Sequence, residues 1–343
     1  MDILLAEAMG KPLWAWLLFL SIVVTLLVLD LGVFHRKAHE IGVGESLKLS
    51  AFYVAVGVAF SGWIWYRSGD HAAFEYLTGF FVEWSLAVDN IFVIATIFTY
   101  FAIPRAYQHR VLIYGILGVV VLRAVMIGAG AAIIHEFEWV LHIFAAFLLL
   151  TGIKMLFTAD KGYDVGANPV LTFMRRRFRI TRELHGERFL VRQEDPKTGR
   201  RVLCMTPLLL ALVLVEIADI IFAVDSIPAV FMITTDPYIV YTSNIFAVLG
   251  LRALFFTLSA MIHRFIYLKY ALAVVLIFIG GKIFVTDMLD LGKMPPSLSL
   301  AITLAILGSG VLVSMWRTRQ LVAKEARRRA RDEAAAGERR GTA

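Results

Sequence analysis

Residues 83–91 read EWSLAVDNI and residues 219–227 read DIIFAVDSI, and these two stretches decide how the chain folds. Both lie in long apolar sequence, and both carry Ala-Val-Asp followed by a small polar residue. Aligned at a common offset of 136, they match Glu83 to Asp219 and Asp89 to Asp225. The chain therefore carries one acidic motif twice.

Two basic motifs follow each acidic motif along the chain. VLRAV around Arg123 matches GLRAL around Arg252, and TGIKMLF around Lys154 matches IGGKIFV around Lys282. Each set of motifs spans three apolar segments, and because three is odd, the second set must cross a membrane in the opposite sense to the first. The sequence predicts two inverted three-helix repeats with a substrate site between them.

Composition places these repeats in a lipid bilayer. Of the 343 residues, 59% are hydrophobic, and the mean hydropathy is +0.75. Apolar runs of about 20 residues are long enough to span the hydrocarbon core as helices. We expect an all-α polytopic membrane protein, which excludes a soluble fold. The apolar windows predict nine transmembrane helices, at roughly 13–33, 48–66, 74–100, 110–134, 138–157, 206–233, 240–262, 267–286 and 297–316.

Basic residues orient these helices, because Lys and Arg accumulate in short cytoplasmic loops. With the N-terminus outside, the cytoplasmic loops and tail hold 27 of the 34 Lys and Arg residues. We expect the N-terminus outside, the C-terminus in the cytoplasm, and basic residues that meet lipid headgroups and no nucleic acid. The predicted parts are two N-terminal membrane helices in 1–70, the repeats at 74–158 and 206–288, a basic cytoplasmic loop with a hairpin at 159–205, a last membrane helix at 297–316 and a basic cytoplasmic tail at 317–343.

Nine of the charged residues inside the predicted membrane helices lie in or beside the repeated motifs. Each costs about 2.5 to 3.5 kcal/mol at a helix centre on insertion scales, so such groups pair or line a wet cavity. One explanation is mutual neutralisation in ion pairs between helices, although buried pairs stabilise a protein less than apolar packing does. Repetition at matching positions favours a binding site instead. The acids are Glu83, Asp89, Glu216, Asp219 and Asp225, and the bases are Arg123, Lys154, Arg252 and Lys282.

The spacing of the acids restricts this site. Glu83 and Asp89 are six residues apart, which on a regular helix separates them by about 120° and about 9 Å along the axis. They cannot hold one ion by themselves. Either the helix is interrupted, or Asp89 acts together with Asp225 while the outer acids handle a proton or a second ion position.

Further oxygen ligands lie close to the two aspartates in the sequence. Asn90 and Ser226 directly follow them, and Asn244 in the next helix is a third candidate. Pro228 lacks an N–H and displaces the carbonyl of Val224. This favours an interruption of the second acidic helix that leaves the carbonyl oxygen available to a cation.

Ligand type narrows the choice of ion. Carboxylate, amide, hydroxyl and backbone oxygens suit Mn²⁺, Mg²⁺ or Ca²⁺, whereas Zn²⁺ and copper sites usually contain His or Cys. Cys204 is the single cysteine, which excludes an internal disulfide and a multi-thiolate site. His35 and His39 lie one helical turn apart beside Glu40, where an ordinary solvated loop is favoured over an ion-sensing site. The residue types leave the choice among the three hard ions open.

Four longer motifs occur along the chain, namely LDLGVFHRKAHE at 29–40, EWSLAVDNIFV at 83–93, HGERFLVR at 185–192 and VEIADIIFAVDSIPAVF at 215–231. Together they resemble the TerC/Alx family of integral membrane proteins, and the resemblance runs from about residue 12 to residue 316. It implies a bacterial inner-membrane protein with the helical fold of the lysine-exporter superfamily, in a family associated with tellurite resistance and manganese efflux. The family's acidic motif positions fall on Glu83, Asp89, Asn90, Glu216, Asp219, Asp225 and Ser226.

These observations predict a membrane exporter of divalent metal ions and no enzyme. Mn²⁺ is the expected cargo, and no permanently bound cofactor is expected; both the manganese and the outward direction follow from the resemblance. Without a Walker motif, export would be coupled to protons or run downhill. The ion would be held by Asp89 and Asp225 together with Asn90, Ser226 and freed backbone carbonyls. Three further acids would admit the ion or exchange protons, namely Glu83, Glu216 and Asp219. Four basic residues would act as counter-charges when the ion is absent, namely Arg123, Lys154, Arg252 and Lys282.

Two other functions stay open at this point. In one, the four basic residues bind an oxyanion such as tellurite, and the acids serve as counter-ions. In the other, the protein is a membrane scaffold or redox modulator that works with stress proteins and transports nothing. A single cysteine gives the redox function little support, since the chain offers no resolving cysteine.

Overall fold

The structure of the chain is a computed structural model. It describes residues 7–30, 42–158, 164–181, 183–194, 200–260, 268–288 and 294–341, without several side chains, among them those of residues 87–89. The elements in chain order are β1 (Glu7–Ala8), β2 (Lys11–Pro12), α2 (Leu13–Leu29), α3 (Val43–Tyr100), α4 (Arg105–Glu136), α5 (Val140–Thr158), α6 (Pro169–Arg177), β3 (Leu190–Glu194), β4 (Arg201–Met205), α7 (Pro207–Phe231), α8 (Pro237–Ala260), α9 (Leu268–Met288) and α10 (Pro296–Gly341).

The apolar windows predicted the membrane helices well. In the described part of the chain, seven helices are long and apolar enough to span a membrane, and the shorter α2 is apolar along its 17 residues. The windows 48–66 and 74–100 both lie in α3, as two legs of one helical element. An all-α polytopic membrane protein is therefore confirmed. The repeat relation between its halves stays a prediction.

The two legs of α3 meet at Gly69. Its φ of 88° and ψ of 178° lie where side chains are rarely tolerated, so glycine permits the chain to reverse here. Tyr76 in the second leg donates a hydrogen bond of 2.9 Å to the backbone oxygen of Gly57 in the first leg. α3 is thus a helical hairpin, and its second leg carries Glu83.

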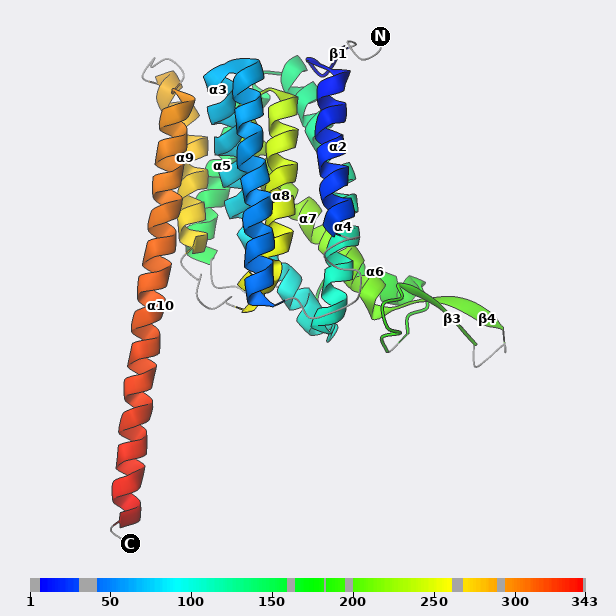
Figure 1. Cartoon of the computed structure of the whole chain (residues 1–343), viewed down its shortest axis with the longest axis vertical. Helices are drawn as coiled ribbons and strands as arrows, with labels where there is room; N and C mark the ends of the chain where they lie inside the picture. Colours follow the sequence, from blue (N-terminus) through cyan, green and yellow to red (C-terminus); the bar gives the residue numbers. More distant parts are fainter. Residues whose placement is uncertain are drawn as a thin grey trace.

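The long helices form one bundle with α8 in its middle (Figure 1). The apolar window of α8 is buried throughout, as expected for a helix that is apolar on every side. α2 begins at the end of the bundle where the α3 legs reverse, whereas α6, β3, β4 and the long extension of α10 lie at the other end (Figure 1). Which of these ends faces the cytoplasm stays a prediction from the basic residues.

The predicted hairpin exists between α5 and α7. β3 pairs with β4 in antiparallel register, with Val191 opposite Cys204. Residues 195–199, which join the two strands, lie outside the described residues, and so does the candidate histidine site at 35–40.

α6 was not predicted, although the sequence contains its start signal. The side chain of Asn168 accepts hydrogen bonds from the backbone nitrogens of Val170 and Leu171, at 2.9 and 3.3 Å. Pro169 occupies the first helical position, where its missing N–H costs no hydrogen bond. An N-cap residue followed by proline is a recognisable helix start, and a shorter search window would have found it.

α5 and α9 approach each other through two glycines. A Cβ atom on Gly152 would lie 2.8 Å from the backbone oxygen of Ala273, and one on Gly280 would lie 2.6 Å from the backbone oxygen of Ala145. The alanine precedes the glycine by seven residues in each helix, so the two contacts are reciprocal. Small residues permit such close backbone packing between membrane helices.

The predicted interruption of the second acidic helix is wrong. α7 runs continuously from Pro207 to Phe231 and contains Pro228. Pro228 lies near the helix end, where its fixed φ fits helical geometry and the backbone loses a single hydrogen bond, to the carbonyl of Val224. α3 is also helical from 83 to 89. The acids of each motif therefore project from uninterrupted helices.

Candidate functional site

Arg123 lies at the centre of a buried group of charges. Its side chain is fully buried, and Glu83 is 1% exposed. Arg123 Nη1 donates to Glu83 Oε1 and to Asn244 Oδ1, while Nε and Nη2 donate to the carboxylate of Asp219, each at 3.3 Å. Asn244 Nδ2 donates to Glu83 Oε2 at 3.0 Å. We call these four residues the Arg123 cluster.

Four helices hold the Arg123 cluster, since α3, α4, α7 and α8 supply one residue each. A buried arginine is tolerated only where its fork of N–H groups meets acceptors, and here two carboxylates and an amide oxygen do this. Asn244 uses both its oxygen and its nitrogen within the cluster, so it is not placed as an ion ligand. The cluster is a fixed internal network that joins both halves of the chain.

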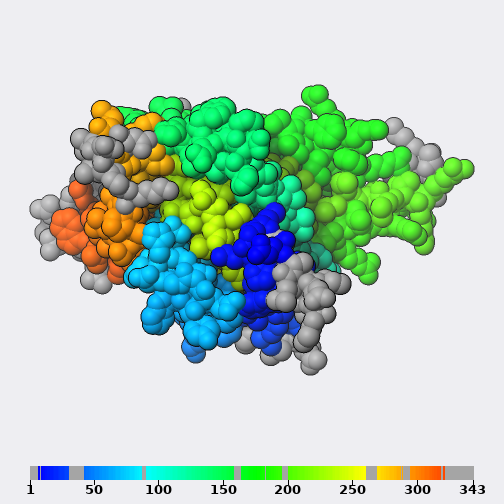
Figure 2. Space-filling view, turned by 90° about the horizontal axis from the view of Figure 1, so that it is seen from above, coloured from blue at the N-terminus to red at the C-terminus, as the bar shows by residue number. Residues whose placement is uncertain are grey.

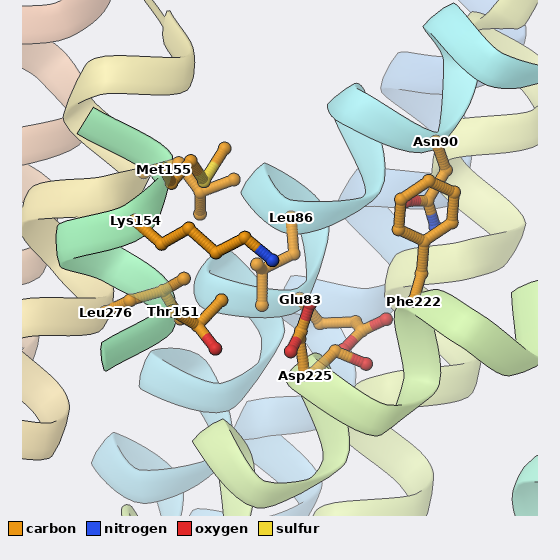
Figure 3. A pocket seen from close by; sticks show the side chains of 11 residues that line it. Glu83, Leu86, Asn90, Thr151, Lys154, Met155, Phe222, Asp225 and Leu276 are labelled. Atoms are coloured by element: carbon orange, nitrogen blue, oxygen red, sulfur yellow. The ribbon is translucent and has the colours of Figure 1, made fainter. Parts of the chain in front are cut away.

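A cavity of about 240 Å³ lies beside the Arg123 cluster, between α3, α5, α7 and α9 (Figure 3). Glu83 belongs to both, since it also lines the cavity. We call this space the Asp225 cavity. Its polar lining residues are Glu83, Asn90, Thr151, Lys154, Asp225 and Ser226.

Two residues that line the Asp225 cavity carry a buried oxygen atom without a hydrogen-bond partner among the described residues. The atoms are Asn90 Oδ1 and Ser226 Oγ, from side chains that are 7% and 2% exposed. Buried polar atoms in native proteins nearly always have a partner, so each such atom needs an explanation. A ligand in the cavity would provide one.

A positive and a negative side chain enter the Asp225 cavity from opposite helices. Asp225 projects from α7 and is half-buried, whereas Lys154 projects from α5 and is exposed. Figure 3 shows the Lys154 ammonium group extending into the cavity toward the side where Glu83 and Asp225 lie. The cavity therefore holds an internal cation on a flexible stem beside oxygen ligands.

Glu216 and Arg252 form a second group of charges outside this cavity. Both carboxylate oxygens of Glu216 are buried without a hydrogen-bond partner among the described residues. A Cβ atom on Gly115 would lie 2.6 Å from Arg252 Nη1 and 3.0 Å from Glu216 Oε1, and one on Gly118 would collide with the same carboxylate. Arg252 also donates to the backbone oxygen of Leu112. The glycines of α4 thus make room for both charges.

Lys282 lies apart from the other predicted counter-charges. It lines a larger cavity of about 480 Å³ together with Glu75, His142 and Asp236. This cavity is formed where α7 and α9 end, near the reversal of the α3 legs. We call it the end cavity.

The chain matches the family described as Integral membrane protein TerC family over residues 68–321. It belongs to the TerC family. The matched range includes both acidic motifs and all nine of the charged residues that lie in or beside the repeated motifs. No solved structure matches this TerC protein.

Three similar proteins cover nearly all of this TerC chain. The membrane protein STKORF319 of Myxococcus xanthus is 42% identical over 320 residues, which are 93% of this chain and 97% of the relative. A membrane protein of Rickettsia felis is 44% identical over 303 residues, 88% and 98% of the two chains. Alx of Escherichia coli (strain K12), which carries the provisional name of membrane-bound redox modulator, is 42% identical over 319 residues, 90% and 96% of the two chains.

The structure divides the predicted oxygen ligands of this TerC protein. Four of the seven line the Asp225 cavity, namely Glu83, Asn90, Asp225 and Ser226. Asp219 is held in the Arg123 cluster, and Glu216 faces α4. The seventh, Asp89, has a side chain outside the described set. Within the described residues, no group of three or more His, Cys, Asp and Glu side chains is arranged to hold a metal ion.

Sequence reasoning missed Thr151 as a lining residue of the TerC cavity. It precedes Lys154 by three residues, and residues at this spacing share one face of a helix. The motif around Lys154 therefore contained the signal. The glycines of α4 and α5 were missed as well, because their role depends on which helix packs against them.

Proposed function

We propose that this TerC protein exports a divalent metal ion, with Mn²⁺ as its cargo, through the Asp225 cavity. The observation that carries the proposal is the set of oxygen atoms in that cavity. Glu83 and Asp225 line the cavity, and so do Asn90 and Ser226, whose buried oxygens Oδ1 and Oγ have no hydrogen-bond partner in the described structure. Carboxylate, amide and hydroxyl oxygens are ligands that hard divalent cations prefer.

The charges around α7 support a cation rather than an anion. Among the described side chains of the predicted set, four carboxylates stand against three basic groups when Lys282 is counted with the end cavity. These groups therefore carry a net negative charge, which a cation would balance. An oxyanion would have to enter a cavity that already contains Glu83 and Asp225, and both would repel it.

Lys154 gives the empty Asp225 cavity a tethered cation. In the proposed cycle, Mn²⁺ binds to Asp225, Asn90 and Ser226 and displaces the Lys154 ammonium group, with Asp89 as a further ligand. The Arg123 cluster keeps Glu83 in place during this exchange, because Arg123 and Asn244 both contact its carboxylate. Return of the lysine would favour release of the ion on the other side, in exchange for protons or along its gradient.

The choice of Mn²⁺ and the outward direction rest on the family resemblance, as do the bacterial inner membrane and the orientation with the N-terminus outside. The name of Alx, the similar protein of Escherichia coli, suggests a redox function as the other candidate. Thiol chemistry within one chain needs two cysteines, and this sequence contains only Cys204. We therefore favour transport.

The decisive experiment measures cell manganese by elemental analysis in bacteria that lack their own manganese exporters. Wild type should lower cell manganese, and Asp225→Asn should fail to do so at equal membrane abundance. Asp164→Asn is the matched control, because this exposed aspartate lies outside the cavity. Equal export by all three proteins would make Asp225 a structural residue.

Purified protein in vesicles separates the remaining functions. The proposal expects Mn²⁺ flux that stops with Asp225→Asn. Flux of tellurite that survives this substitution would favour the oxyanion carrier. A folded protein that moves neither Mn²⁺ nor tellurite in vesicles, and that cells still require under stress, would favour a scaffold.

A further inference from the structure

A small folded unit is attached to one end of the bundle. It consists of α6, β3, β4 and the segments that join them, within residues 164–205 and without 182 and 195–199. We call it the surface unit. Neither the Arg123 cluster nor the Asp225 cavity includes any of its residues.

The surface unit is fixed to the bundle by apolar and polar contacts. Leu171 and Met174 of α6 are buried in the same apolar cluster as residues of α3, α4 and α7. Arg110 of α4 forms a salt bridge of 2.6 Å with Glu187, and its guanidinium lies 5.7 Å from the ring centre of Phe189. The unit therefore has a defined position relative to the membrane helices.

The surface unit exposes both apolar and basic side chains. Phe173 is 60% exposed on α6, and Leu203 is 59% exposed on β4. Cross-strand pairing places Leu203 opposite Arg192, so apolar and basic groups share one face of the hairpin. Phe178 and Leu190 are exposed as well. The described arginines of the unit are all exposed, namely Arg175, Arg176, Arg177, Arg179, Arg188, Arg192, Arg200 and Arg201.

The surface unit lies beside the bundle, not beneath it. In Figure 1 β3 and β4 extend sideways at the level where the membrane helices end. Viewed along the bundle in Figure 2, the unit projects beyond the outline of the helices and is not covered by them. In a bilayer around the bundle, lipid headgroups occupy the space above this projecting part.

We propose that the surface unit lies on the bilayer and binds the headgroups of anionic phospholipids, with Phe173 and Leu203 inserted into the interface. Guanidinium groups form paired hydrogen bonds with phosphate, and each basic group near an anionic surface adds to the attraction. Apolar side chains among them gain by leaving water for the boundary of the acyl chains. A nucleic acid would satisfy the arginines and would offer Phe173 a base to stack on, but it would leave Leu203 in water, so lipid accounts for all of these side chains.

The test uses the single native cysteine. Cys204→Ser gives a cysteine-free chain, into which Phe173→Cys or Leu203→Cys introduces one site for a nitroxide label. The labelled full-length protein is reconstituted in phosphatidylglycerol or phosphatidylcholine vesicles. Collision of the label with oxygen and with a water-soluble nickel complex then reports its depth. Leu150→Cys on the exposed side of α5 serves as the lipid reference, and Gln193→Cys, on the other face of the hairpin, as the water reference.

Labels at 173 and 203 should be severalfold less accessible to the nickel complex than the label at 193 in phosphatidylglycerol vesicles. Replacing Arg175, Arg176 and Arg177 by Gln, or using phosphatidylcholine, should move both labels toward the water reference. Accessibility equal to that at 193 in phosphatidylglycerol would overturn the proposal. Equal depth of the labels in phosphatidylglycerol and phosphatidylcholine vesicles would overturn it as well. So would protection of the labels from the nickel complex that appears only when RNA or cytosolic protein is added. Circular dichroism of each variant verifies the helical fold.

Discussion

The Arg123 cluster and the Asp225 cavity differ in how their charged and polar groups are paired, although α7 contributes an aspartate to each. Asp219 is held by a fully buried arginine, and the polar groups around Arg123 have partners within the protein. Six residues further on, Asp225 is half-buried, and its cavity is also lined by an exposed lysine and by residues with buried oxygens that have no partner in the described part of the chain. One region fixes charges in place, and the other offers the positions that we propose a cation occupies. Substitutions should separate these roles, because loss of a fixed pair affects folding and loss of an open ligand affects cargo.

The largest expected effect on stability is that of Arg123→Met. It would leave Glu83 and Asp219 buried without their counter-charge, which costs about 3 to 5 kcal/mol in comparable buried pairs. Thermal unfolding in detergent micelles should show a large drop in melting temperature. Combining the change with Glu83→Gln and Asp219→Asn removes the uncompensated charges and should restore part of the loss. A melting temperature equal to wild type for the single variant would mean that the cluster is not a fixed network.

Asn244→Ala should have the next largest effect. It removes one of the two acceptors of Arg123 Nη1 and the donor to Glu83 Oε2, and unsatisfied buried groups cost roughly 1 to 3 kcal/mol. The same thermal assay measures the loss. Thr96→Ala is a suitable control, because this exposed hydroxyl bonds only its own helix. Full stability of Asn244→Ala together with lost Mn²⁺ flux would instead make Asn244 an ion ligand.

Gly280→Ala should disturb the wall of the cavity through the backbone. The added methyl group would meet the backbone oxygen of Ala145 at 2.6 Å, and a backbone cannot swing aside, so α5 and α9 must separate at a cost of ~1 to 3 kcal/mol. Gly281→Ala adds the same methyl group into open space and should be neutral or slightly stabilising. Thermal unfolding compares the two neighbours directly. Equal melting temperatures would show that the helices are not in close contact.

Ser226→Ala should have the smallest effect on stability, and with the opposite sign. It removes a buried hydroxyl without a partner, which should stabilise the fold by up to ~1 kcal/mol. It also removes one proposed ligand, so Mn²⁺ flux in vesicles should fall. Ser85→Ala removes another buried hydroxyl without a described partner, outside the cavity, and should stabilise without changing flux. Unchanged flux in both variants would exclude Ser226 as a ligand.

Prediction from the sequence succeeded for features that one short stretch of residues determines by itself. Apolar windows predicted the membrane helices, and two short β-type runs on either side of residues 195–199 predicted the hairpin strands. It failed at Pro228, because α7 stays helical through this proline although the backbone loses its hydrogen bond to the carbonyl of Val224. The joining of 48–66 and 74–100 through Gly69 also escaped, since a single glycine in a polar stretch does not reveal its φ.

The candidate site was predictable in its residue types but not in its pairing. The sequence identified the acids, the bases and the neutral oxygens beside the aspartates, and four of these residues share a cavity. It could not show that Arg123 would meet Glu83 and Asp219, which lie 40 and 96 residues away along the chain. Nor could it assign Lys154 and Lys282 to different cavities, because that depends on how α5 and α9 cross.

The crossing of α5 and α9 has a consequence for how the chain enters a membrane. Because Gly152 meets Ala273 and Gly280 meets Ala145, exchanging the two helices leaves the contact unchanged. Such a contact is equally good whichever of the two helices points up, so it carries no information about sidedness. That information must reside elsewhere in the polypeptide, and we expect the uneven distribution of its 34 basic residues to supply it. Neutralising the basic loops would therefore be expected to scramble insertion while leaving this helix pair intact.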